Sequence, residues 1–72
     1  MRLPSFTSRR LVQAFNRAGF EIDRQSGSHV VLRHPPARRA VIPFHNRKLK
    51  RGTLLGIIKQ AGYAVEEFIE LI

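Results

Sequence analysis

Residues 20–34 read FEIDRQSGSHVVLRH, and this stretch predicts the centre of the fold. Apolar and charged residues alternate over residues 20–25, which is typical of a strand with one buried face. The Ser-Gly-Ser sequence at 26–28 has the composition of a tight turn, and residues 29–34 are rich in β-branched residues. The stretch therefore predicts an antiparallel hairpin of two strands.

The alternation of side chains along these strands also predicts which residues are buried. In the first strand, Phe20 and Ile22 share the face that we expect to pack in the core. The second strand divides into two sets, which are Val30, Leu32 and His34 on one face and His29, Val31 and Arg33 on the other. If Val30 and Leu32 face the core, His29 and Arg33 stand together on the open face, although Val31 keeps the opposite assignment possible.

A helix is predicted before the hairpin and a third strand after it. Residues 9–18 have an apolar stripe at helical spacing, with Thr7 or Ser8 as the N-cap and Gly19 as the stop. Prolines and alanine at 35–37 break the sheet, and residues 39–42 are predicted to form the third strand, which ends at Pro43.

The C-terminal part is predicted to be helical. Residues 44–51 form a basic loop, and Thr53 is the predicted cap of a helix that reaches residue 61 and is closed by Gly62. Gly56 lies inside this helix, which indicates a close neighbour there. A short last helix follows from the helical spacing of four apolar residues, Val65, Phe68, Ile69 and Ile72.

These elements predict a single α+β domain over residues 1–72. The order is α-β-β-β-α with a short C-terminal helix, and a three-stranded antiparallel sheet carries helices on one face. The same order is similar to that of double-stranded-RNA-binding domains, but a fold alone does not establish a function.

The charge of the chain points to a polyanionic partner. The 72 residues include 13 Lys and Arg but only 5 Asp and Glu, for a formal net charge of +8. No acidic residue occurs over residues 24–65, where most of the basic residues lie. Such a basic region is typical of RNA or DNA binding, and the alternative is a solvated surface that only confers solubility. A membrane partner is disfavoured, because the sequence has neither a long apolar run nor a long basic amphipathic helix.

Cysteine is absent and the N-terminus lacks the apolar core of a signal peptide, so we expect a cytoplasmic protein without disulfides. A metal site is also not expected. His29 and His34 are five residues apart and project from opposite faces of one strand, and no carboxylate lies nearby in sequence. We therefore expect the protein to need neither a metal ion nor any other cofactor.

The histidines and the basic residues of this region have the chemistry that metal-free RNA cleavage needs. In the metal-free reaction, the 2′-hydroxyl loses a proton as it attacks the phosphate, and the leaving 5′-oxygen gains one. Histidine titrates near neutral pH and serves either transfer, while cations stabilise the charge on the phosphoryl oxygens. The alternative for His29 is an ordinary surface residue at a strand start. The sequence shows no arrangement typical of a hydrolase triad and no phosphate-binding glycine loop.

Several segments resemble the HicA-type mRNA-interferase toxins, which have a double-stranded-RNA-binding-like fold. The similarity begins at Gly19-Phe20 and Gly27-Ser28-His29 and continues through the Val-Ile-Pro-Phe-His sequence at 41–45. It resumes at Leu49, runs through residues 52–62 and recurs at Glu67-Phe68. The segments occur in the expected order over nearly the whole chain.

The resemblance implies an endoribonuclease that cleaves mRNA, arrests growth and is neutralised by a HicB-type antitoxin. The catalytic histidine of the family corresponds to His29. His45 matches a second recurring histidine, whose role is either to bind substrate or to order the basic loop. The chain differs from the family in a longer leader before the first helix and in Pro35-Pro36-Ala37, where a glycine-containing turn is more common, and both differences concern substrate fit.

We therefore predict a metal-independent endoribonuclease with His29 as the general acid or base. Arg33 is a candidate phosphate clamp and Ser28 a candidate hydrogen-bond donor to phosphate. The remaining candidates for RNA binding are His45, Arg47, Lys48, Lys50 and Arg51. Two alternatives remain, a non-catalytic RNA-binding module and an adaptor whose basic face binds an acidic partner.

Overall fold

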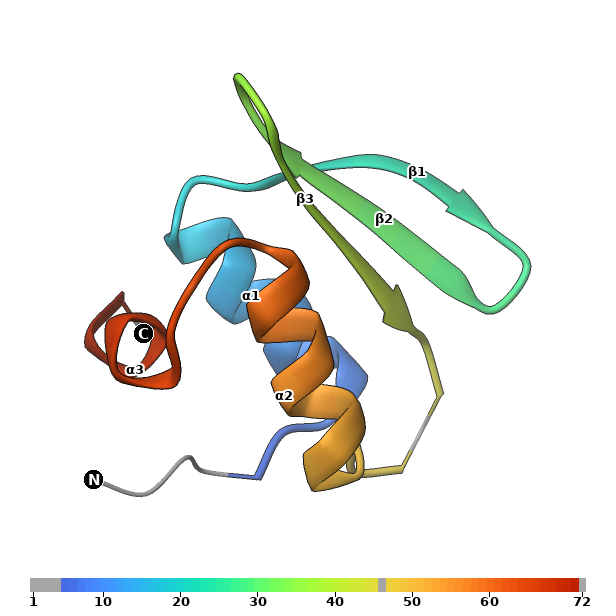
Figure 1. Cartoon of the computed structure of the whole chain (residues 1–72). Coiled ribbons are helices and arrows are strands. Elements are labelled where there is room, and N and C mark those ends of the chain that lie inside the picture. The colour runs from blue at the N-terminus through green and yellow to red at the C-terminus, as the bar shows by residue number, and fades with distance from the viewer. Residues whose placement is uncertain (1–4, 46, 72) are drawn as a thin grey trace.

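The computed structural model describes residues 5–45 and 47–71. The elements across these residues are α1 (Ser8–Arg17), β1 (Glu21–Ser26), β2 (His29–His34), β3 (Arg38–Pro43), α2 (Arg51–Gln60) and α3 (Val65–Leu71). The strands form one antiparallel sheet in the order β1-β2-β3, and α1 and α2 lie on the same side of it (Figure 1). The predicted α+β class, element order and three-stranded sheet are confirmed.

Helix α1 begins where the sequence predicts, with Thr7 as its N-cap. The Thr7 hydroxyl accepts a hydrogen bond from the backbone N–H of Arg10 at 3.2 Å, which satisfies one of the free N–H groups of the first turn. Gly19 follows the helix with a φ of 99°, a left-handed conformation that suits glycine. The chain then turns back toward the sheet, and Phe20 is buried with its ring centroid 4.9 Å from that of Phe15.

The predicted division of β2 into two faces is confirmed. Val30 and Leu32 belong to the core cluster and pair with Ile42 and Ala40 of β3, which are also buried. Val31 is buried as well, but it lies outside that cluster and pairs with Val41 on the opposite face. His29 and Arg33, which share the parity of Val31, are exposed.

The prediction that β1 is half-buried is wrong. All six of its residues are exposed, and the side chain of Ile22 is 56% accessible. The register places Ile22 opposite Leu32, but β1 is an edge strand that extends beyond the helices (Figure 1). A shift in register between Ile22 and Arg24 further disturbs the alternation. Burial therefore reaches only Phe20, just before the strand.

Two predictions for α2 are also wrong. The helix begins at Arg51 with Lys50 as its N-cap, so Thr53 lies inside the first turn and caps nothing. The N–H of Leu54 already donates to the Lys50 carbonyl at 2.9 Å, which sets the earlier start. Gly56 is exposed, and a Cβ atom added there would meet nothing within 4 Å, so no close neighbour explains this glycine.

The last helix completes the core through one aromatic residue. Phe68 of α3 is fully buried, and its ring centroid lies 4.9 Å from that of Phe15 and 6.3 Å from that of Phe6. Val65 and Ile69 are half-buried and pack against the core, as their spacing predicts. Ile72, the fourth residue of the predicted stripe, lies outside the described residues.

Candidate functional site

The C-terminal end of β3 lies beside the turn between β1 and β2. His29 begins β2 and pairs with Pro43, the last residue of β3. The N–H of Phe44 donates a hydrogen bond to the carbonyl oxygen of Ser28. Ser28 and His29 therefore lie beside the residues that lead directly to His45. The fold thus brings two histidines that are 16 positions apart in sequence to one end of the sheet.

A buried serine from α1 fixes the same junction. The side chain of Ser8 is 0% exposed, and its hydroxyl donates to the Pro43 carbonyl at 2.6 Å and accepts the backbone N–H of His45 at 3.2 Å. The local sequence indicates Ser8 only as an alternative N-cap, a role that Thr7 fulfils. No local pattern could have indicated partners 35 and 37 residues away.

The basic loop is anchored by backbone contacts with the segment before α1. The N–H of Leu49 donates to the carbonyl of Phe6 at 2.8 Å, and Thr7 forms an isolated antiparallel bridge with Lys48. Leu49 is buried, whereas Lys48 and Lys50 on either side of it are exposed. The buried Leu49 therefore anchors the loop, and the lysines beside it remain exposed to solvent.

These cations surround a hollow next to the end of β3. We call it the cationic hollow, and it is lined by Pro43, His45, Arg47, Lys48, Leu49, Lys50 and Thr53. It contains four of the predicted RNA-binding residues and no acidic residue from the described part of the chain. Arg51, the fifth predicted residue of this region, is exposed at the start of α2 but does not line the hollow.

His45 is shared between this hollow and a smaller one. The second hollow is lined by Thr7, Arg9, Phe44 and His45, so Arg9 adds a cation that is not among the residues predicted to bind RNA. Arg9 lies on α1, and its local sequence contains no signal that it lies close to the basic loop. The imidazole of His45 is exposed, and its Nδ1 atom accepts the backbone N–H of Arg47 at 3.2 Å.

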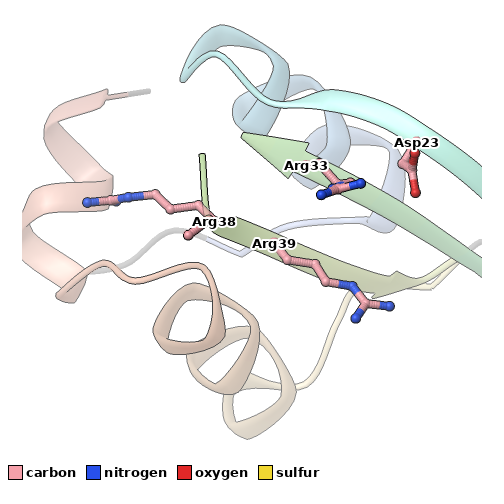
Figure 2. A pocket seen from close by; sticks show the side chains of 5 residues that line it. Asp23, Arg33, Arg38 and Arg39 are labelled. Carbon is pink, nitrogen blue, oxygen red and sulfur yellow. The ribbon is translucent and has the colours of Figure 1, made fainter. Parts of the chain in front are cut away.

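Arg33 lies on the same open face as His29 but is not its immediate neighbour. The two residues are four positions apart along the strand, which separates their Cα atoms by about 13 Å, and Val31 stands between them. Across the sheet Arg33 pairs with Glu21 and with Arg39. Figure 2 shows Asp23, Arg33 and Arg39 around a hollow on this face.

Arg38 borders that hollow, but its side chain extends away from the other three labelled residues (Figure 2). Its guanidinium lies 4.4 Å from the centroid of the Tyr63 ring, a cation–π contact. Arg38 therefore contributes to packing against the C-terminal part of the chain, and Arg39 is the cation that accompanies Arg33.

His34 lies on the opposite side of the sheet from His29. Its ring is half-buried with a centroid 5.2 Å from that of Phe20, and its Nδ1 lies 2.8 Å from the Pro35 carbonyl, to which it donates. The two histidines of β2 therefore do not converge. Within residues 5–45 and 47–71, no three side chains from histidine, aspartate and glutamate are placed to hold a metal ion.

The family model for the HicA toxin of bacterial toxin–antitoxin systems matches residues 8–63 of the chain. The chain belongs to the HicA toxin family. The matched span covers more than three quarters of this HicA toxin and includes Ser8, both histidines at the end of the sheet and the cationic hollow. A search of curated proteins finds no match to the chain. No helix in the described part of this HicA toxin has the length and apolar character needed to cross a membrane.

Proposed function

We propose that this HicA toxin is a metal-independent endoribonuclease that cleaves mRNA, with His29 as its acid–base residue. The observation that carries the proposal is the convergence of His29, His45 and the cationic hollow at one end of the sheet. A titratable group and several cations at one end of the sheet are the components that RNA cleavage by internal attack requires.

The proposed reaction uses the RNA's own nucleophile. The 2′-oxygen forms a bond to phosphorus and loses its proton, while the bond from phosphorus to the 5′-oxygen breaks and that oxygen gains a proton. The products are a 2′,3′-cyclic phosphate and a 5′-hydroxyl end, so protons and electrons balance without an oxidant or cofactor. His29 takes part in one of the two proton transfers.

The cations of the hollow supply binding and charge stabilisation. Arg47, Lys48 and Lys50 line this hollow with His45, Arg9 lines the smaller hollow that His45 shares, and Arg51 follows Lys50 in the sequence. Contacts between such cations and RNA phosphates are largely independent of sequence, so they position the strand rather than select a base. Ser28 and Arg33 are candidates for further contacts on either side of His29.

The partner that we propose is a HicB-type antitoxin, which would neutralise the toxin in the cytoplasm. A toxin–antitoxin partner follows from the family. The exposed open face, with His29 at one end and Arg33 and Arg39 at the other, is the surface that we expect the antitoxin to cover.

The test is incubation of the purified protein with mRNA in EDTA. We expect cleavage to persist, and we expect the new ends to be a 2′,3′-cyclic phosphate and a 5′-hydroxyl. A matched oligonucleotide with a single 2′-deoxy substitution at a mapped cleavage position is the control, because it lacks the attacking hydroxyl. It should resist cleavage at that position only.

Two results would contradict the proposal. Loss of all cleavage in EDTA, with recovery on addition of a divalent ion, would refute the metal-independent mechanism. Salt-sensitive RNA binding without any cleavage would instead identify the chain as a non-catalytic RNA-binding module.

A further inference from the structure

Two hydrogen bonds hold His45 at both its backbone and its ring. The backbone N–H of His45 donates to the buried Ser8 hydroxyl, and the backbone N–H of Arg47 donates to His45 Nδ1, each at 3.2 Å. Ser8 in turn donates to the Pro43 carbonyl. The His45 backbone is thus linked through Ser8 to the end of β3, and its ring is linked to the basic loop.

The contact with Arg47 specifies the tautomer of His45. A backbone N–H can only donate, so Nδ1 must be the acceptor and carries no proton. The proton of the neutral ring is therefore on Nε2. The lone pair of Nδ1 already accepts the Arg47 N–H, so the ring atom that is left to interact with a ligand is the Nε2–H donor.

The surroundings of His45 identify the acceptor as an anion. The two hollows that His45 lines bring Arg9, Arg47, Lys48 and Lys50 around it, and within the described ranges neither hollow is lined by an acidic side chain. His45 is itself exposed. An exposed N–H donor among several cations suits a phosphoryl oxygen.

We infer that His45 is a catalytic residue that donates the Nε2–H hydrogen bond to a non-bridging phosphoryl oxygen, and that Ser8 is its positioning residue. The inference rests on the proposed ribonuclease function. As the 2′-oxygen bonds to phosphorus and the 5′-oxygen leaves, negative charge grows on the phosphoryl oxygens and strengthens this hydrogen bond. The His45 proton stays on Nε2 throughout, so His45 is not the second acid–base group.

Three single variants test the role of His45 with a defined oligoribonucleotide. His45→Gln retains an amide donor near the position of Nε2 but cannot titrate, whereas His45→Ala removes the donor. We expect kcat to fall by about 10²–10³ in His45→Ala, the typical cost of losing one such donor, and to fall far less in His45→Gln. Gln13→Ala, an exposed change on α1 outside both hollows, is the control and should leave cleavage unchanged.

The pH–rate profile provides the second readout. We expect His45→Gln to keep every limb of the wild-type profile, because no titrating group of the reaction has been removed. Inactivity of His45→Gln equal to that of His45→Ala, or loss of a limb of the profile, would overturn the inference and make His45 an acid–base group. Wild-type rates in His45→Ala would exclude any catalytic role. These outcomes concern His45 alone, because the wild-type protein still cleaves RNA in each of them and the proposed function stands. If the wild-type protein itself does not cleave RNA, the proposed function is contradicted.

A double-mutant cycle tests the role of Ser8. If Ser8 acts by positioning His45, Ser8→Ala should lower kcat in the wild-type background but have little further effect in His45→Ala. Ser8→Thr retains the hydroxyl and should restore part of the rate. Equal losses in both backgrounds would assign Ser8 to fold stability alone and overturn its positioning role.

Discussion

His29 combines an exposed position with a fixed backbone, because its side chain is exposed while its strand pairs on both sides, with Ser26 and Pro43. Such a residue contributes little to the core, and we expect His29→Ala to change the free energy of unfolding by no more than about 0.5 kcal/mol. RNA affinity should be nearly unchanged, because it depends on Lys and Arg contacts with phosphates. Cleavage should fall by a factor of about 10²–10⁴, the usual contribution of an acid–base group.

Thermal melting, RNA binding and cleavage should be measured on the same His29→Ala sample. Gln25→Ala is a suitable control, since Gln25 is an exposed strand residue that pairs with Val30, on the other face. Activity that disappears only because the variant unfolds would make His29 a structural residue. A folded variant that binds RNA and cleaves at the wild-type rate would refute its catalytic role.

At the scale of elements, the basic loop and the start of α2 act as one cationic unit. The loop is anchored through Leu49, and the helix begins at Arg51 without a side-chain cap. Replacement of Lys50 and Arg51 by alanine should weaken RNA binding and flatten the plot of log K against log salt by about 1–1.4, because each phosphate contact with a single strand contributes about 0.7.

Lys59→Ala combined with Arg17→Ala is the control for this prediction. Both residues are exposed in the last turns of their helices, and Lys59 is about 13 Å along α2 from Lys50. The control removes two positive charges, as the Lys50 and Arg51 variant does. Its slope of log K against log salt should stay closer to that of the wild type. An unchanged slope in the Lys50 and Arg51 variant would show that these side chains only solvate the surface.

At the scale of the whole molecule, the net charge of +8 is expected to govern encounter with the antitoxin. We expect the antitoxin to present an acidic surface to the open face of the sheet and to cover His29. Complementary charge speeds association, and added salt screens it, so the association rate should fall as ionic strength rises. Stopped-flow mixing at several salt concentrations measures this directly. A salt-independent rate, or a complex that leaves His29 and the basic loop open, would contradict the expectation.

Short-range patterns in the sequence were enough to predict the local features of this fold. Side chains alternate along any strand, so the parity of residues 29–34 correctly separated Val30 and Leu32 from His29 and Arg33. Glycine tolerates the left-handed conformation, so Gly19 and Gly62 correctly marked helix ends. The order and type of the elements followed from such short-range rules.

Which of these residues lie close together in space depends on tertiary packing. Ile22 has the parity of a core residue but is exposed, because its strand lies at the edge of the sheet. His29 and His45 share one end of the sheet because strand register and the Ser28–Phe44 hydrogen bond place them there. The two bonds of Ser8 join residues more than 30 positions apart. Local periodicity carries no information about contacts between residues so far apart in sequence, because these contacts depend on how separate elements pack.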